Sequence, residues 1–177
     1  GGLDAMAFAT GMAAVTTLME LFSPGDHIIS SDDLYGGSYR LFDHVCKKNG
    51  LTFDLVDTTN IQNIQERIRP ETKAVFIETP TNPMMHVTDL AAVARLCKIH
   101  NLLLVVDNTF LTPYFQRPLL LGADVVIHSG TKYLGGHNDT LAGFLVVSDA
   151  GLAERLRFLY KTTGPCLSPF DSWLLIR

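Results

Sequence analysis

The chain has 177 residues, of which 47% are hydrophobic and 18% are charged, and its formal net charge is −4. This length and composition suit one globular domain and exclude a disordered chain. The slightly acidic balance gives no basic footprint for nucleic acid, and the longest aliphatic run, residues 102–106, is too short to cross a bilayer. Three widely spaced cysteines form no CxxC pair, so we predict neither a zinc site nor a disulfide framework and expect a cytoplasmic protein.

Both ends of the chain lie inside sequence features. The start, GGLDAMAFATG, has neither an initiator Met nor the basic region of a signal peptide. The last residues, DSWLLIR, form an apolar stretch typical of an unfinished helix. We therefore expect the chain to be a segment of a longer protein.

Helical and strand-like patterns alternate along the chain. The first helix is predicted to begin after Thr10, a residue type that suits an N-cap. Several strand candidates are near-continuous apolar runs, as expected for strands covered on both faces. In chain order we predict a helix at 11–22, a strand at 27–30, a helix at 38–48, a strand at 51–56, a helix at 60–69, a strand at 73–78, a helix at 88–100, strands at 102–107, 124–128 and 143–147, and a helix at 152–161. This alternation predicts a doubly wound, mainly parallel α/β sheet.

Polar side chains follow three consecutive predicted strands. Asn82 follows the strand at 73–78, Asp107 ends the next strand, and the segment from Ser129 to Lys132 follows the third. Ligands of parallel α/β sheets bind at the carboxyl ends of the strands, so we expect these side chains to share one site. The segment 9–13 opens a helix, whose free backbone N–H groups and positive dipole end suit a phosphate.

One stretch, DVVIHSGTKYLGGHN, resembles the lysine-attachment segment of the Cys/Met-metabolism, or trans-sulfuration, family of pyridoxal-phosphate-dependent enzymes. That family includes cystathionine gamma-synthase, cystathionine beta- and gamma-lyases, methionine gamma-lyase and O-acylhomoserine sulfhydrylases. The motifs AFATGMAA, SPGDHI, DLYGGSYRLF, ETPTNP, VVDNTF, QRPLLLGAD and SPFDSWLLIR appear in family order, so the resemblance covers nearly the whole chain. Departures are mild: Thr10 stands where Ser is commoner, and Gly130 where Ala is commoner.

The resemblance implies a three-layer, mainly parallel seven-stranded sheet of the aspartate-aminotransferase-like type (fold type I). Residues 1–177 would then be a fragment of the large, pyridoxal-phosphate-binding domain. The N-terminal arm and the C-terminal small domain of such enzymes would lie outside this chain.

The resemblance also implies residue roles. Lys132 would bind pyridoxal 5′-phosphate covalently as an imine, and Asp107 would pair with the pyridine nitrogen and keep it protonated. The hydroxyls of Ser129 and Thr131 would bind the phosphate. Backbone N–H groups of Gly11 and Met12 would complete that cradle.

Tyr35 resembles the tyrosine that stacks on the cofactor ring and assists the leaving group, so we expect Lys132 and Tyr35 to be the catalytic residues. Asn82 resembles the residue beside the ring hydroxyl. His137 has no partner at metal-ligand spacing and is predicted to be structural, and no metal is expected. Arg117 is also predicted to be structural.

The implied reaction is beta- or gamma-elimination, or gamma-replacement, on a sulfur amino acid or an O-acylhomoserine. The segment YLGGHND-x-LAG most resembles that of cystathionine gamma-synthase-like enzymes, and cystathionine beta- or gamma-lyase and methionine gamma-lyase are the alternatives. The resemblance implies a homotetramer built from two active dimers, and neither a nucleic-acid nor a membrane partner. We expect the 177 residues alone to turn over little or no substrate.

Three other interpretations fit parts of the sequence. Ser129-x-x-Lys132 fits the S-x-x-K of penicillin-recognising acylases, but no SDN is present and the segment 161–164 is KTTG rather than KTG. No GxGxxG follows any strand, which disfavours a nicotinamide-binding domain. A non-catalytic assembly module that retains the fold stays open as the alternative from another class.

Overall fold

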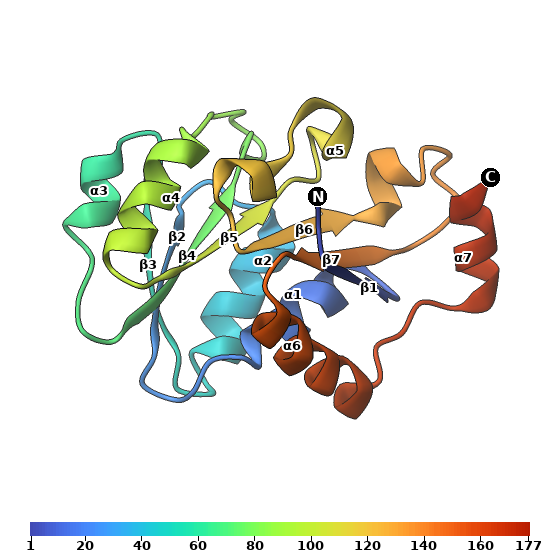
Figure 1. The fold of residues 1–177 in the computed structure, drawn as a ribbon, viewed down its shortest axis with the longest axis horizontal. Coiled ribbons are helices and arrows are strands. Elements are labelled where there is room, and N and C mark those ends of the chain that lie inside the picture. The colour runs from blue at the N-terminus through green and yellow to red at the C-terminus, as the bar shows by residue number, and fades with distance from the viewer.

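The computed structural model describes all 177 residues and contains one seven-stranded sheet (Figure 1). The strand order is β1-β7-β6-β5-β4-β2-β3. The strands are β1 (Asp4–Phe8), β2 (His27–Ser31), β3 (Thr52–Val56), β4 (Thr72–Glu78), β5 (Leu103–Asp107), β6 (Val125–Ser129) and β7 (Gly143–Val147). Strands β2 to β6 pair in parallel, whereas β7 runs antiparallel to both of its neighbours. The mainly parallel α/β sheet is therefore confirmed.

All six predicted strands are present, and none of their ends differs from the prediction by more than one residue. Strand β1 was not predicted. Its sequence, DAMAF, contains residues of weak strand preference, and it forms because it pairs with β7 along its whole length.

The helical elements are α1 (Gly11–Met19), α2 (Gly36–Arg40), η1 (Leu41–Cys46), α3 (Ile61–Gln65), α4 (Leu90–Ile99), α5 (Thr112–Phe115), η2 (Pro118–Leu121), η3 (Gly130–Leu134), α6 (Ala150–Thr163) and α7 (Pro169–Ile176). The helix predicted at 38–48 was wrong as a single α-helix, because a short α-helix passes there into the π-helical turn η1. The prediction at 88–100 began two residues too early, because Asp89 caps α4 by accepting from the N–H of Ala92. The unfinished helix expected at the end is α7, which begins at a Ser168 cap.

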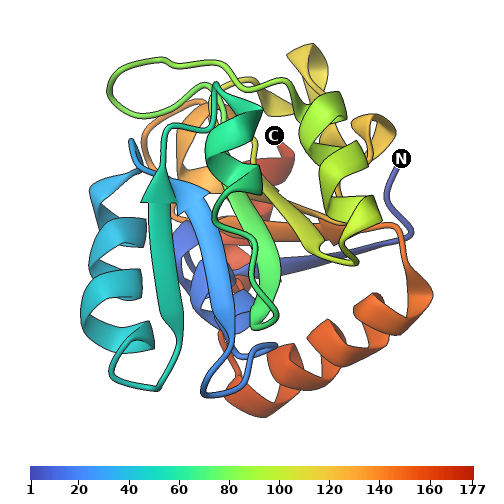
Figure 2. The same ribbon diagram turned by 90° about the vertical axis from the view of Figure 1, so that its left-hand side faces the viewer.

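Helices cover both faces of the sheet. Helices α1 and α6 and the α2–η1 segment lie on one face, and α3 and α4 lie on the other (Figures 1 and 2). Strand β4 illustrates why, since Ala74 and Phe76 enter the first core and Val75 and Ile77 enter the second. Alternate side chains of a strand point to opposite faces, so a continuously apolar strand needs cover on both.

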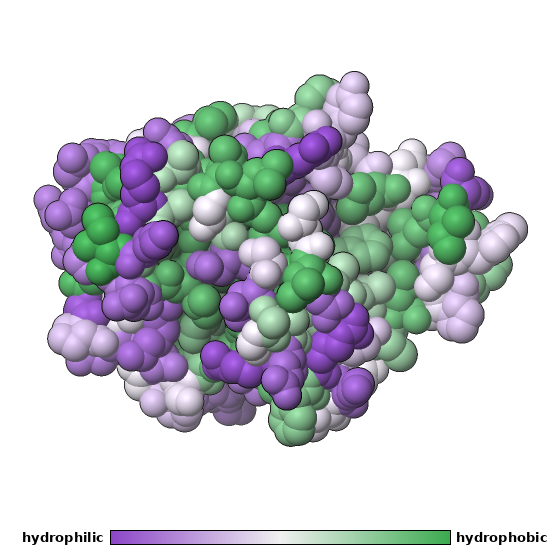
Figure 3. Space-filling model, viewed as in Figure 1, coloured by the Kyte–Doolittle hydropathy of each residue, from purple (hydrophilic) through white to green (hydrophobic).

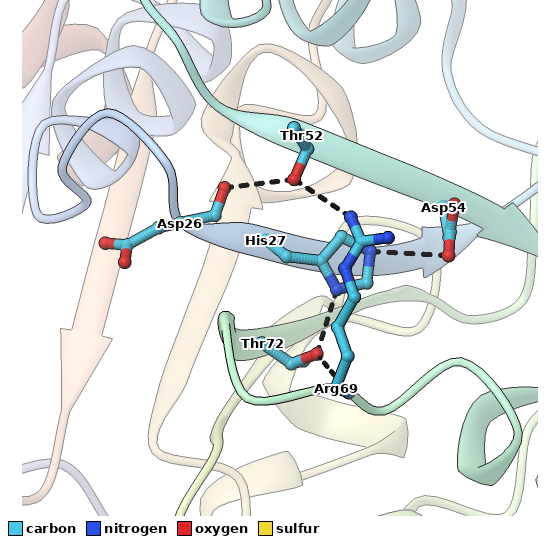
Figure 4. Close-up of polar contacts among 6 residues, drawn as sticks. All are labelled: Asp26, His27, Thr52, Asp54, Arg69 and Thr72. Carbon is cyan, nitrogen blue, oxygen red and sulfur yellow. Dashed lines mark hydrogen bonds and ion pairs between the residues drawn. The ribbon is translucent and has the colours of Figure 1, made fainter.

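A polar cluster ties together the amino ends of three strands (Figure 4). The buried His27 imidazole lies 2.9 Å from the Thr72 hydroxyl and 3.5 Å from a carboxylate oxygen of Asp54. Arg69 reaches the Thr52 hydroxyl at 3.1 Å. Burial, followed by the nearby Arg69 charge, lowers the pKa of His27. Because His27, Thr52 and Thr72 begin β2, β3 and β4, the cluster lies at the edge opposite the strand carboxyl ends and has a structural role.

Helix α7 exposes large apolar side chains at the end of the chain. Phe170, Trp173 and Ile176 are 67%, 63% and 85% exposed, and Figure 3 shows apolar residues on the lobe that carries α7. Exposed apolar side chains that gather on one helix in this way are typical of a contact surface. None of the helices is both long and apolar enough to cross a bilayer.

Candidate active site

A cavity of about 350 Å³ opens at the carboxyl ends of β4, β5 and β6, within the size range of small-molecule sites. The structure brings every residue predicted for the cofactor site to its wall. These residues are Gly11, Met12, Tyr35, Asn82, Asp107, Ser129, Thr131 and Lys132. The cavity also contains residues that the sequence analysis did not single out, chiefly Glu78 and Thr109.

The first turn of α1 forms one wall of the cavity. The Thr10 hydroxyl accepts from the N–H of Ala13 at 2.9 Å, which caps the helix as predicted. The N–H groups of Gly11 and Met12 lie in the first turn, have no acceptor within the protein and border the cavity. A helix start of this kind fits an anion such as a phosphate.

Two glycines allow α1 to approach the sheet this closely. A Cβ at Gly11 would lie 3.1 Å from the Cβ of Ser129, and a Cβ at Gly143 would lie 2.2 Å from the Thr10 carbonyl oxygen. Real Cβ atoms almost never come nearer than 3.0 Å to another atom. The packing of β6 and β7 against the start of α1 therefore requires glycine at 143.

The predicted lysine segment follows β6 directly. The Ser129 N–H donates to the Thr109 hydroxyl at 2.9 Å. The Ser129 hydroxyl does not cap the turn that follows, and Ser129 lines the cavity. Lys132 lies within the short π-helical turn η3, at a residue whose backbone is not helical. The Thr131 hydroxyl donates to the Ala142 carbonyl at 3.2 Å and accepts from the Ala142 N–H at 3.1 Å. A phosphate contact from Thr131 would therefore require its hydroxyl to release the Ala142 carbonyl.

Asp107 ends β5 in the cavity wall. Its Oδ1 accepts from the N–H of Thr109 at 3.0 Å and from the Thr109 hydroxyl at 2.6 Å. Burial raises the pKa of Asp107, and the Thr109 hydrogen bonds lower it. No Lys, Arg or His forms an ion pair with Asp107 in this structure. A partly buried carboxyl group without a cationic partner fits the protonated nitrogen of a pyridine ring.

Glu78 is the acidic residue that sequence reasoning missed. It ends β4 directly beside Asp107, because the parallel register aligns the last residues of the two strands. Burial, followed by the Asp107 charge, raises the pKa of Glu78 to about 8. The signal was available in the sequence, since Glu78 and Asp107 both close apolar strand runs, but the register that places them side by side was not.

Tyr35 and Asn82 lie on two loops that are tied to each other. The Tyr35 side chain is 46% exposed beside the cavity, and Asn82 lies in the long connection between β4 and α4 that extends beyond the sheet in Figure 2. Asp33 accepts hydrogen bonds from the Met84 N–H at 2.8 Å and from the Thr81 hydroxyl. This link holds the Asn82 loop against the loop that carries Tyr35.

Other reactive groups lie away from the cavity. The exposed His137 contacts the Gly135 carbonyl at 2.8 Å, and no group of three His, Cys, Asp or Glu residues is arranged to hold a metal. Arg117 donates to the Pro113 carbonyl at 3.3 Å and does not line the cavity. Burial raises the pKa values of Cys46 and Cys97 to about 11 and about 12, so neither thiol forms a nucleophile at neutral pH.

Comparison with known proteins identifies the family that has this sequence and fold. The family model of Cys/Met metabolism PLP-dependent enzymes matches residues 1–177. The chain is 56% identical over 176 residues to a cystathionine gamma-synthase/O-acetylhomoserine (thiol)-lyase of Bacillus subtilis (strain 168), which covers 99% of this chain and 47% of that protein. It is 52% identical over 171 residues to a cystathionine gamma-lyase of the same organism, covering 97% of this chain and 45% of that protein.

A solved structure has the same fold as this chain. Cystathionine gamma-lyase from Lactobacillus plantarum, complexed with L-serine, superposes with a TM-score of 0.97 at 49% identity, and the match covers 98% of this chain and 46% of that one. The fold type I assignment is therefore confirmed. The chain spans about half the length of the curated relatives it matches. It belongs to the Cys/Met metabolism family of pyridoxal-phosphate-dependent enzymes.

Proposed function

We propose that residues 1–177 are the cofactor-binding large domain of a longer trans-sulfuration enzyme that resembles cystathionine gamma-synthase. The observation that carries the proposal is the gathering of all eight predicted cofactor residues on one cavity, with Lys132 and Asp107 among them. The 56% identity to a protein named as a gamma-synthase and thiol-lyase supports the choice of reaction. Relatives named cystathionine gamma-lyase and beta-lyase, at 52% and 48% identity, keep the lyase reaction as the second candidate.

The cavity residues divide the work of holding the cofactor. The N–H groups of Gly11 and Met12 and the hydroxyl of Ser129 would bind the phosphate, and Asp107 would hold the proton on the ring nitrogen. When bound, pyridoxal phosphate supplies an electron sink that stabilises a carbanion on the substrate. Lys132 would provide the amine that attaches the cofactor.

Two side chains would move protons. The Lys132 amine, once released by the substrate amine, would take the proton from the substrate Cα and, in gamma-chemistry, a proton at Cβ. The Tyr35 ring would stack on the cofactor, and its hydroxyl would assist departure of the sulfur or oxygen leaving group. Asn82, on the loop beside the cavity, would lie next to the ring hydroxyl.

Assembly and substrate recognition extend beyond this chain in the proposal. We propose a cytoplasmic homotetramer of two active dimers, in which flanking segments complete the site and bind the substrate carboxylate. The substrate would be an O-acylhomoserine or a sulfur amino acid. The alternative of a non-catalytic assembly module is disfavoured because no candidate cofactor residue is replaced by an unreactive one.

The cofactor is tested with the full-length protein, pyridoxal phosphate and borohydride. We expect a visible absorption band that borohydride bleaches, with a cofactor adduct mapped to Lys132. Lys132→Ala should lose the band, whereas the exposed Lys161→Ala should keep it. A folded full-length protein that shows no band would contradict the enzymatic function and favour the assembly module.

The reaction is tested by product analysis. The full-length protein is given cysteine with O-acetylhomoserine in one assay and cystathionine alone in another. Cystathionine formation at the faster rate supports the synthase, whereas release of an oxo acid from cystathionine at the faster rate would replace it with the lyase. The 177-residue chain assayed beside it should release neither product.

A further inference from the structure

Glu78 occupies a place in the site that the proposed function leaves without a role. Its side chain is 7% exposed, lines the cavity and makes no ion pair. The N–H of Glu78 is held by the Ser31 hydroxyl at 3.3 Å, which fixes the end of β4 to the end of β2. A buried acidic group without a cation needs another reason to be stable in this position.

One reason is its contact with the Tyr35 loop. Glu78 Oε2 accepts a hydrogen bond from the Tyr35 N–H at 2.9 Å. On its other side the Tyr35 ring lies against Gly37, where a Cβ would come within 2.3 Å of the ring. The main chain of Tyr35 is thus attached to the sheet by Glu78 while Gly37 leaves room for the ring. The position of the ring beside the cavity therefore depends on the Glu78 carboxyl group.

The other reason is its neighbour. Glu78 and Asp107 are register partners at the ends of adjacent strands, and both line the cavity. The charged groups that act on Glu78 are Asp107 on β5 and Asp33 on the loop after β2. Lys132 lines the same cavity. Two carboxyl groups side by side do not both ionise readily when one of them is buried, because burial disfavours a charge and like charges repel. Burial, Asp107 and Asp33 all raise the pKa of Glu78, and the Tyr35 N–H opposes them.

We propose that Glu78 is a positioning residue of the cofactor site: its carboxyl group holds the Tyr35 main chain in place and, beside the carboxyl group of Asp107, stays uncharged. This inference rests on the proposed function. Glu78 acts through Tyr35 and Asp107 and itself takes no part in the proton transfers.

The test compares Glu78→Gln with Glu78→Ala in the full-length protein. Glutamine keeps the acceptor for the Tyr35 N–H and carries no charge, whereas alanine removes the acceptor. We expect the dissociation constant of pyridoxal phosphate to stay within about twofold for Glu78→Gln and to rise about fivefold for Glu78→Ala, with a weaker visible dichroism of the bound cofactor. The exposed Glu71→Gln is the control and should change neither value. Equal affinity and dichroism in the Gln and Ala variants would overturn the positioning role.

A second measurement uses the cofactor-free protein and keeps the test independent of the alanine variant. Below about pH 4.5 the glutamate is protonated in folded and unfolded chains alike. As the pH rises toward 8, the unfolded chain loses this proton and the folded chain retains it, so the wild type loses stability that Glu78→Gln keeps. We therefore expect the melting temperature of Glu78→Gln to exceed that of the wild type increasingly between pH 5 and 8. A pH-independent difference would overturn the uncharged state of Glu78.

The two levels of the proposal fail in different ways. If borohydride fixes the cofactor to Lys132 but the Glu78 variants behave as the wild type does, the inference about Glu78 is wrong and the proposed function stands. If no cofactor is fixed in any version of the folded protein, the proposed function and this inference are both wrong.

Discussion

Gly143 provides a sharp test of how the phosphate end of the site is built. It begins β7, where it pairs with Phe8 on one side and Ser129 on the other, so the sheet holds its backbone in place. A Cβ there would lie 2.2 Å from the Thr10 carbonyl oxygen and 2.7 Å from the Gly11 nitrogen. Both contacts are to main-chain atoms, so no side-chain rotation relieves them. Gly143→Ala therefore requires the start of α1 to move away from the sheet.

The magnitude follows from the cost of overpacking, which is about 1–3 kcal/mol for an inserted methyl group. Because the strained atoms belong to the phosphate-binding turn, we expect cofactor binding to bear this cost. The dissociation constant of pyridoxal phosphate should rise by a factor of about 5 to 150. The assay is a titration of the full-length protein followed by the visible absorption of the bound cofactor. Thermal unfolding of the cofactor-free protein reports the accompanying loss of stability.

Gly151 is the matched control. It lies near the start of α6, where a Cβ would meet only the Asp149 carboxylate oxygen at 3.4 Å. Alanine is a better helix former than glycine, so Gly151→Ala should leave cofactor binding unchanged and raise stability by up to about 1 kcal/mol. If Gly143→Ala bound the cofactor as tightly as Gly151→Ala, the start of α1 would not be the phosphate site.

Three further outcomes are expected. Asp107→Asn removes the carboxyl group, so it should weaken pyridoxal phosphate binding at least about tenfold. Because the pKa of Asp107 is raised in the folded chain, the cofactor-free Asn variant should be more stable than the wild type at pH 8, and unchanged affinity would remove Asp107 from the site. Burial lowers the pKa of His128 to about 4 in the folded chain. As the pH falls from 6.5 to 4, the free energy of unfolding of the wild type should therefore fall by about 3 kcal/mol relative to that of His128→Leu, measured by urea unfolding. A difference that stays constant with pH would contradict a neutral, buried His128. Phe76 is fully buried in the core, and its ring lies edge-on to that of Phe42 with 5.2 Å between the ring centroids. Phe76→Ala should therefore lower the free energy of unfolding by about 3–5 kcal/mol in the same assay. A loss below about 1 kcal/mol would argue against this packing.

The strands and the chemistry at their ends were open to prediction from the sequence. Apolar runs such as residues 102–107 are covered on both faces, and that requirement leaves a continuous hydrophobic pattern. Polar residues at the ends of such runs stand out for the same reason, which is how Asn82, Asp107 and the Ser129–Lys132 segment were found. The motifs around them also indicated the family, which the comparisons confirm.

The helices were less predictable where local signals are weak. The segment 38–48 has an apolar pattern suited to a helix, but the pattern does not reveal that the backbone widens to a π-helical turn from Leu41 onward. Strand β1 was missed because Ala and Met do not favour strands by themselves, and its pairing partner β7 lies at the other end of the sequence.

The sequence by itself determined which residues carry the chemistry, because reactive side chains and strand ends are local features of a chain. Only the tertiary structure decided which of these residues are neighbours in space. The parallel register sets Glu78 beside Asp107, the antiparallel entry of β7 brings Gly143 against the start of α1, and the Ala142 main chain occupies the Thr131 hydroxyl. These neighbours come from segments far apart in sequence, and their contacts exist only after the sheet has aligned its strands through main-chain hydrogen bonds, which carry no side-chain signal.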